Sequence, residues 1–318
     1  MTAAAHDQRA RPLVYVAGHR GLAGSAVWRA YERRGDVALV GRTSSELDLR
    51  DRDATFDFVN ELRPDAVVMA AARVGGIGAN AAHPVEFLSD NIRIQTNVLD
   101  AAHQAEVPKL VLLGSSCIYP KHATQPITED ALLTGPLEPT NDAYAIAKIA
   151  GILHVQAMRR EYGHRWISAM PTNLYGPGDN FDPSSSHVLA ALLRRFDEAT
   201  RAGARSVTVW GTGSPRREFL HADDLASAVL FLLDHYDDDR PINVGTGSDL
   251  TIAELAQLIA DTTGFTGAIE FDPAKPDGTP RKLLDVSRLT ALGWTARIGL
   301  GDGLRDFYAW YRSQTSTP

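Results

Sequence analysis

The chain has 318 residues, a formal net charge of −7, 44% hydrophobic residues and 22% charged residues. This composition is typical of a globular enzyme, and the length suffices for one large α/β domain or two smaller ones. The negative net charge argues against a nucleic-acid-binding surface, which requires clustered basic residues. A single cysteine excludes an internal disulfide.

No stretch of the sequence has the character of a membrane segment. The N-terminal "MTAAAHDQRARP" lacks an apolar core of signal-peptide length, and we expect it to be a frayed tail. The longest apolar run, "LASAVLFLL" at 225–233, is too short to cross a bilayer. We therefore expect a cytoplasmic protein without a membrane or nucleic-acid partner.

The first half of the chain alternates short apolar runs with helical patterns. The strand-like runs cover residues 13–18, 37–41, 66–72 and 109–116. Their near-continuous apolar character is typical of parallel strands that helices cover on both faces. "SAVWRAYERRG" predicts a helix that stops at Gly35, and a long helix from near Asn141 precedes a fifth strand, "WISAMPTNLYG". Right-handed crossovers then give an α/β fold with a Rossmann-type doubly wound parallel sheet.

The second half predicts a smaller, discontinuous domain. After Gly178 the chain forms a polar loop and a helix, and then a helix and a strand ("INVGTG") return to the sheet. The tail carries an amphipathic helix, "TIAELAQLIADTTG", a polar loop and a closing helix. We assign residues 12–178 and 218–247 to the larger domain, and residues 179–217 and 248–318 to the smaller one.

A glycine-rich loop, "GHRGLAG", directly follows the first predicted strand. Gly18 makes the tight turn, Gly21 lets the backbone approach a pyrophosphate, and Gly24 lets the helix pack on the strand. The helix N-terminus supplies free N–H groups and partial positive charge. This context predicts a dinucleotide site that also includes Arg20 and Leu22.

The end of the second predicted strand favours NADP over NAD. NAD sites usually place an acidic residue there for the ribose 2′-hydroxyl. This chain reads "GRTSSELDL", in which Arg42 and Ser44, with Arg20, would receive a 2′-phosphate without an opposing carboxylate. The alternative is that Arg42 is a solvated surface charge. We expect Asp48 and Leu49 at the adenine edge.

A candidate hydride-transfer site follows from "YAIAK". Tyr144 and Lys148 are four residues apart and share one face of a predicted helix. The lysine ammonium should lower the pKa of the phenol, which makes it usable as an acid or base. Ser115 leaves the end of the fourth strand, where parallel sheets collect ligands, and can donate to a substrate oxygen.

With these motifs the chain resembles the extended short-chain dehydrogenases/reductases. The resemblance covers "GHRGLAGSA", "AARVGGIGAN", "LGSSCIYPK", "LEPTNDAYAIAKIAG", "MPTNLYGPGDNFDPSSSHV" and "KPDGTPRKLLDV". The long middle blocks are similar to those of the epimerase-reductases that convert GDP-4-keto-6-deoxy-D-mannose into GDP-L-fucose. The resemblance implies 3,5-epimerisation followed by NADPH-dependent reduction at C4, with Ser115, Tyr144 and Lys148 as the reductase triad.

The resemblance also gives the single cysteine a role. A lone cysteine is most often a buried small hydrophobe, and a lone histidine is more often solvated or capping. Inverting two centres α to a ketone requires a base and an acid on opposite ring faces, and the resemblance implies Cys117 and His187 for these roles. Cys117 lies on the same side as Ser115 if the strand geometry persists. Which of the pair is the base at each centre stays open.

Further contacts come from the resemblance. Arg195 and Arg217 are candidates for the diphosphate, since guanidinium groups pair bidentately with phosphate. The sequence leaves open whether these or their neighbours Arg194 and Arg216 point inward. The other implied substrate contacts are Trp210 at the guanine, Asp277 and Lys282. The other implied cofactor contacts are Leu113, Gly114, Lys148, Pro171, Asn173, Leu174 and His187.

No metal is expected, and the resemblance suggests a homodimer formed by helices that flank the sheet. Two alternatives stay open. The first is another NAD(P)-dependent nucleotide-sugar epimerase or reductase, which would have no use for Cys117 with His187. The second is a non-catalytic NADP-sensing protein, which would be expected to lose part of the Ser-Tyr-Lys triad.

Overall fold

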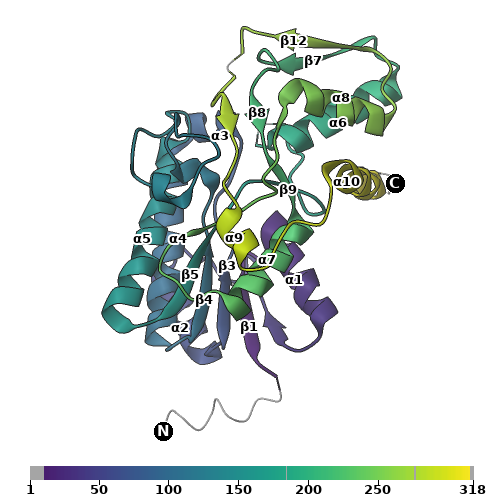
Figure 1. The fold of residues 1–318 in the computed structure, drawn as a ribbon. Coiled ribbons are helices and arrows are strands. Elements are labelled where there is room, and N and C mark those ends of the chain that lie inside the picture. The colour runs from purple at the N-terminus through teal and green to yellow at the C-terminus, as the bar shows by residue number, and fades with distance from the viewer. Residues whose placement is uncertain (1–10, 184, 276, 316–318) are drawn as a thin grey trace.

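A six-stranded parallel sheet forms the centre of the larger part of the molecule (Figure 1). The computed structural model describes residues 11–183, 185–275 and 277–315, so most of the expected N-terminal tail lies outside the described residues. The strand order is β10-β5-β4-β3-β1-β2. The strands are β1 Leu13–Ala17, β2 Ala38–Val40, β3 Ala66–Met69, β4 Lys109–Leu113, β5 Arg165–Pro171 and β10 Ile242–Val244. The order reverses between β1 and β3, which confirms the predicted doubly wound topology.

Helices cover both faces of this sheet. One layer consists of α1 Leu22–Arg34 and α7 Ala222–His235, and the other of α2 Arg52–Leu62, α4 Pro84–Gln104 and α5 Asp142–Tyr162. Gly35 ends α1 in the left-handed conformation, as predicted. Because helices bury both faces, residues such as Val67, Val68 and Leu110 are fully buried along the strands.

A smaller lobe is drawn above and to the right of the sheet in Figure 1. Its helices are α6 Val188–Ala202, α8 Ile252–Thr263 and α10 Leu300–Thr315, which share an apolar core. Its strands are β7 Ser206–Trp210 paired with β12 Ala268–Asp272, and β8 Arg216–Arg217 between β11 Leu250–Thr251 and β13 Arg281–Lys282. Patterns in such short strands are too weak to be predicted from sequence.

The division into two domains stays a prediction, and one stretch differs from it. Leu289 of α9 (Ser287–Ala291) and Trp294 lie in the core beneath α1 and α7, although the predicted boundary assigns them to the smaller domain. Trp294 Nε1 donates to Ser227 Oγ of α7 at 3.0 Å. Packing against α7 therefore brings this part of the tail back to the sheet.

One buried carboxylate joins the segments that connect the two parts. Glu218 is fully buried between β8 and β9 (Phe219–His221). Its oxygens accept from three backbone amides, Thr246 N at 2.6 Å, Gly247 N at 2.8 Å and Leu284 N at 3.0 Å. Burial raises its pKa, and these amide donors oppose that shift. Glu218 thus joins the end of β10 to the chain that follows β13.

We predict that Glu218→Ala lowers the free energy of unfolding by about 3 kcal/mol, because it leaves three amides without their acceptor. Urea unfolding followed by circular dichroism measures this change. Glu61→Ala, which removes an exposed carboxylate on α2, is the control and should change stability by less than about 0.5 kcal/mol. Equal effects of the two substitutions would contradict the role of Glu218.

Candidate active site

The predicted phosphate loop lies at the carboxyl end of β1, and two of its three glycines, Gly18 and Gly24, are sterically required. Gly18 has a φ of 83°, and a Cβ there would stand 2.7 Å from Ala71 N. A Cβ at Gly24 would stand 2.1 Å from Gly18 O. Gly21 precedes α1, and among the described residues no side chain caps that helix. The first amides of α1 are therefore open to a phosphate, so the loop fits a dinucleotide.

Two arginines converge beside this loop. Burial lowers the pKa of the His19 imidazole, and the charges of Arg20 and Arg42 lower it further. Both arginine side chains are exposed, and Arg42 also lies 5.2 Å from the Phe58 ring centroid. Their shared effect on His19 indicates that they face the same region. This region is where a ribose 2′-phosphate is expected.

One acidic residue of this turn differs from the sequence-based interpretation. Glu46 adds a carboxylate that accepts from Thr43 N at 2.8 Å, so the turn does contain an acidic group. Hydrogen bonds from Thr43, and then the charges of Arg42 and Arg20, lower the pKa of Glu46. Asp48 forms an ion pair with Arg50 at 2.7 Å, and its contact with the adenine stays a prediction.

The fourth strand ends earlier than predicted. β4 stops at Leu113, and Ser116–Ile118 form a turn of 3-10 helix, η1. Ser115 caps this turn, and its Oγ accepts from Cys117 N at 3.4 Å. The expectation that continued strand geometry places Cys117 beside Ser115 is therefore wrong. The turn brings them together instead, because capping folds the chain back over the Ser115 hydroxyl.

Ser115 lies between the thiol and the phenol. Burial raises the pKa of Cys117, whereas a hydrogen bond from Ser115 lowers it. Burial also raises the pKa of Tyr144, the charge of Cys117 raises it further, and a hydrogen bond from Ser115 lowers it. Two of the predicted catalytic groups thus contact the same hydroxyl.

Lys148 lies one turn along α5 from Tyr144, as predicted. Its Nζ is 5.8 Å from the centroid of the Tyr144 ring and donates to Leu113 O at 2.8 Å. Burial lowers the pKa of Lys148 to about 8. The expected lowering of the Tyr144 pKa by Lys148 is not found: burial and then the charge of Cys117 raise that pKa, and the group that lowers it is Ser115, so the phenol stays protonated at neutral pH.

A second lysine faces the thiol from the smaller lobe. Burial has the largest effect on the pKa of Cys117 and raises it. The charge of Lys282 has the next largest effect and lowers that pKa. Lys282 pairs with Arg217 in the parallel β13–β8 register. Burial and the charge of Arg217 lower the pKa of Lys282, whereas Cys117 and Glu138 raise it. Glu138, which the sequence analysis missed, accepts from Thr140 N at 2.8 Å.

The neighbouring arginines differ in their partners. Arg216 Nε donates to Asp249 at 2.9 Å, whereas Arg217 donates to the carbonyls of Arg216 and Asp277. Arg194 lies 3.6 Å from Glu198 on its own helix, and Arg195 donates to Thr208 O.

Burial lowers the pKa of both Arg195 and Arg217. Among the described residues, neither has an ion-pair partner within 4.0 Å, whereas both of their neighbours do. These two guanidinium groups are therefore the ones left for an anionic ligand.

Trp210 and Asp277 lie at the outer end of the same lobe. Trp210 is 64% exposed, and Lys275 Nζ is 5.4 Å from its ring centroid. Asp277 accepts from Thr212 N at 2.7 Å and from Thr212 Oγ1 at 2.9 Å. An exposed indole face of this kind is suited to stacking on a base.

The remaining predicted cofactor contacts lie along the carboxyl ends of β4 and β5. Leu113 and Pro171 are buried, and Gly114 packs so closely that a Cβ would stand 2.4 Å from Met170 Sδ. Asn173 Nδ2 donates to Glu218 O at 2.8 Å. Asn173 and Leu174 belong to the short strand β6 (Asn173–Tyr175), which pairs with β9, so the predicted fifth strand is in fact two strands.

His187 precedes α6, and its side chain is 46% exposed. The loop before it is attached to the turn after β3, since Gly76 N donates to Ser185 O at 3.0 Å.

A cavity of about 500 Å³ opens beside this loop. It is lined by Arg73, Val74, Gly78, Ala79, Ala82, His83, Phe87 and Ser185. The Phe87 ring lies edge-on to Tyr144, 6.2 Å between centroids, so this cavity adjoins the catalytic helix. The pairing of His187 with Cys117 stays a prediction.

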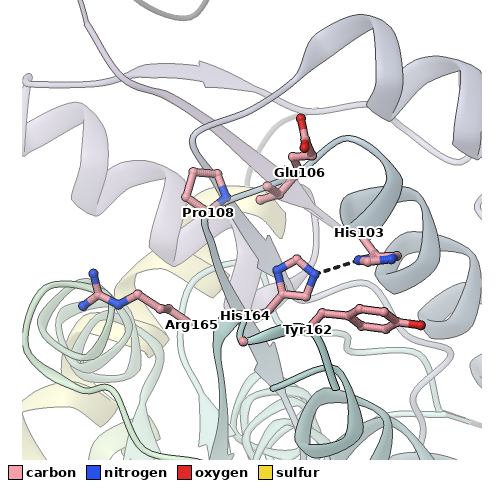
Figure 2. Close-up of a pocket in the computed structure, with 8 residues that line it drawn as sticks. His103, Glu106, Pro108, Tyr162, His164 and Arg165 are labelled. Carbon is pink, nitrogen blue, oxygen red and sulfur yellow. Dashed lines mark hydrogen bonds between the residues drawn. The ribbon is translucent and has the colours of Figure 1, made fainter. Parts of the chain in front are cut away.

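Another cavity, of about 510 Å³, lies at the opposite ends of the strands (Figure 2). There His103 Nδ1 and His164 Nε2 are 2.7 Å apart and share a hydrogen bond. This cavity adjoins the chain that enters β4 and β5. Parallel sheets bind ligands at the carboxyl ends of their strands, so this cavity is not the candidate active site.

In the described part of the chain, no group of three or more His, Cys, Asp or Glu is arranged to hold a metal ion. No helix there is long and apolar enough to cross a membrane.

Comparisons with known proteins identify the family of this chain. Residues 14–245 match the model of the NAD dependent epimerase/dehydratase family. The chain is 55% identical over 298 residues to GDP-L-fucose synthase 1 of Arabidopsis thaliana, which covers 94% of this chain and 92% of that protein. It is 55% identical over 307 residues to GDP-L-fucose synthase of Escherichia coli (strain K12), with coverages of 94% and 96%.

A solved structure extends the likeness to the whole fold. The GDP-L-fucose synthetase from Naegleria fowleri, bound to NADP, aligns with a TM-score of 0.88 at 29% identity. The alignment covers 96% of this chain and 95% of that one. The predicted resemblance is thereby confirmed. This chain belongs to the NAD-dependent epimerase/dehydratase family, and within it to the GDP-L-fucose synthases.

Proposed function

We propose that this chain epimerises GDP-4-keto-6-deoxy-D-mannose at C3 and C5 and then reduces it at C4 to GDP-L-fucose. The observation that carries the proposal is the single cysteine placed between a serine and a lysine, beside the Tyr144–Lys148 pair. A simple ketone reductase requires only the serine, the tyrosine and the lysine. A buried thiol next to an ammonium group adds an acid–base group that epimerisation needs.

The epimerisation proceeds by proton transfer at carbon. The C4 ketone acidifies the protons on C3 and C5, so a base on one face removes one and an acid on the other face returns one. We assign these roles to Cys117 and His187. The negative charge that develops on the ketone oxygen is stabilised by hydrogen bonds from Tyr144 and Ser115. Lys282 favours the thiolate form of Cys117, and so its action as a base.

The reduction uses the same oxygen contacts. NADPH supplies a hydride when it is bound. Tyr144, which burial keeps protonated, donates its proton to the C4 oxygen. Lys148 lies beneath the tyrosine ring and is held by the Leu113 carbonyl, so its charge supports the phenolate that remains. We infer that Arg20 and Arg42 bind the 2′-phosphate, which favours NADP over NAD.

The nucleotide part of the substrate extends into the smaller lobe. We infer that Arg195 and Arg217 bind the diphosphate, that Trp210 stacks on the guanine, and that Asp277 orders the loop beside it. The lack of ion-pair partners for the two arginines among the described residues supports this. A diphosphate accepts bidentate hydrogen bonds from such groups.

We also infer a homodimer formed through α4 and α5. Ile146 and Leu153 lie seven residues apart on α5, are 46% and 41% exposed, and face the same direction. Exposed aliphatic residues at this spacing are typical of a helix that packs against another helix. We infer a cytoplasmic location, because a reducing compartment keeps Cys117 a free thiol.

We predict that Cys117→Ala abolishes epimerisation. With the 4-keto sugar in deuterated water and no NADPH, incorporation of deuterium at C3 and C5 should fall by at least about 100-fold, because an acid–base group is lost. Mass spectrometry and NMR of the sugar measure it. Oxidation of GDP-L-fucose by NADP, which needs no epimerisation, is the control and should persist. Deuterium uptake by Cys117→Ala at the wild-type rate would exclude Cys117 from the epimerisation.

Tyr144→Phe should abolish reduction while leaving cofactor affinity unchanged. The phenol donates a proton to the C4 oxygen, so its loss should lower the rate of NADPH consumption by at least about 100-fold. Stopped-flow absorbance measures the rate, and quenching of protein fluorescence measures NADPH binding. Undiminished turnover would remove Tyr144 from the mechanism.

Lys282→Met should raise the pKa of Cys117, because the ammonium group favours the thiolate. The rate of alkylation by iodoacetamide rises as the thiolate forms, so its midpoint should move to higher pH. The chain has one cysteine, and intact mass therefore reports this thiol alone. Lys282→Arg keeps a cation and is the matched control. A midpoint that does not move in Lys282→Met would contradict this prediction.

A further inference from the structure

His187 lies beside a buried carboxylate that the mechanism above does not use. Asp179 Oδ1 is 4.0 Å from His187 Nδ1, and the Asp179 side chain is only 3% exposed. Oδ1 accepts from Asn180 N at 2.8 Å. Oδ2 is buried and has no hydrogen-bond partner among the described residues. Burying a carboxylate oxygen without a donor costs free energy, so its position requires an explanation.

A rigid turn holds this carboxylate in place. Asp179 N donates to Gly176 O at 3.1 Å. Gly176 and Gly178 have φ values of 139° and 95°, which glycine adopts without strain. A Cβ on Gly178 would stand 2.9 Å from Ser25 Oγ of α1. The turn is thus packed against the helix that carries the phosphate loop, so Asp179 has a fixed position at the cofactor side of the cleft.

The backbone that precedes His187 is held by the turn after β3. Gly76 N donates to Ser185 O, and a Cβ on Gly76 would stand 2.8 Å from Ser186 O, so the loop before His187 is closely packed. Within the described residues, the His187 ring makes no capping bond to α6. The 4.0 Å separation exceeds a hydrogen bond by about 1 Å. In ligand-free structures, catalytic hydrogen bonds are often long and shorten in the complex.

We propose that Asp179 is a positioning residue for His187. The proposal rests on the epimerisation role of His187 given above. By accepting a hydrogen bond from Nδ1–H, the carboxylate selects the tautomer in which Nε2 carries the lone pair. Nε2 then gains the proton that the sugar carbon loses, or returns it in the opposite direction. The carboxylate stays ionised and stabilises the imidazolium.

Asp179→Asn tests this directly. The substitution is nearly isosteric, and the amide oxygen can keep the Oδ1 position, where it accepts from Asn180 N, so the turn is preserved. The negative charge that favours a proton on Nδ1 and stabilises the imidazolium is lost, so the preference for that tautomer should weaken. Asp182→Asn, which removes an exposed carboxylate from the same loop, is the matched control.

The first measurement uses the free enzyme and needs no substrate. Long-range ¹⁵N–¹H NMR of the neutral side chain reports which ring nitrogen carries the proton, and His187→Asn identifies the resonances. We expect the proton mainly on Nδ1 in the wild type and in Asp182→Asn, and a larger share of it on Nε2 in Asp179→Asn. The same tautomer ratio in all three proteins would overturn the proposal.

The second measurement separates positioning from a structural or cofactor role. Asp179→Asn should lower kcat for deuterium exchange into the 4-keto sugar by about 100-fold with little change in KM. Oxidation of GDP-L-fucose by NADP should stay within about twofold of wild type. An equal loss in both reactions, or a rise confined to the KM for NADP, would overturn the proposal. Full exchange activity in His187→Asn would instead refute the proposed function, while the tautomer measurement would still report on Asp179.

Discussion

The carboxylate of Glu218 is the contact on which the geometry of the site depends. It is one residue from Arg217, and it accepts from the amide of Leu284, two residues after Lys282. The same side chain anchors Thr246 and Gly247 after the last strand of the sheet. Glu218 thus helps to place Arg217 and Lys282 relative to the sheet, together with the bond from Leu283 N to Gln125 Oε1. Their two-residue strands are too small to hold themselves in register.

The larger part of the fold could be predicted from sequence because its signals are strong and local. Buried parallel strands are continuous apolar runs, and the steric demands on Gly18 and Gly24 require glycine whatever surrounds them. The smaller lobe could not be predicted in detail. Its two-residue strands β8, β11 and β13 exist only because distant segments meet, and no periodicity encodes them.

Candidate residues for the site could be named from the sequence, but their local contacts could not be predicted. The chain turns at Ser115 instead of continuing as a strand, and this capping geometry, not strand alternation, brings Cys117 to the serine. Glu46 and Glu138 were missed because an isolated acidic residue in a polar loop carries no pattern. Burial dominates the pKa values of Tyr144 and Lys148, and burial is a property of the assembled fold.

The parallel alignment of β13 with β8 has a consequence for the order of events. It sets two cations side by side, and their mutual repulsion weakens the hold of Lys282 on its proton. If Arg217 binds the diphosphate as proposed, the phosphate charge offsets that repulsion, and Lys282 holds its proton more firmly. The proposed function then implies that binding of the nucleotide part favours the cation beside Cys117 before the sugar reacts.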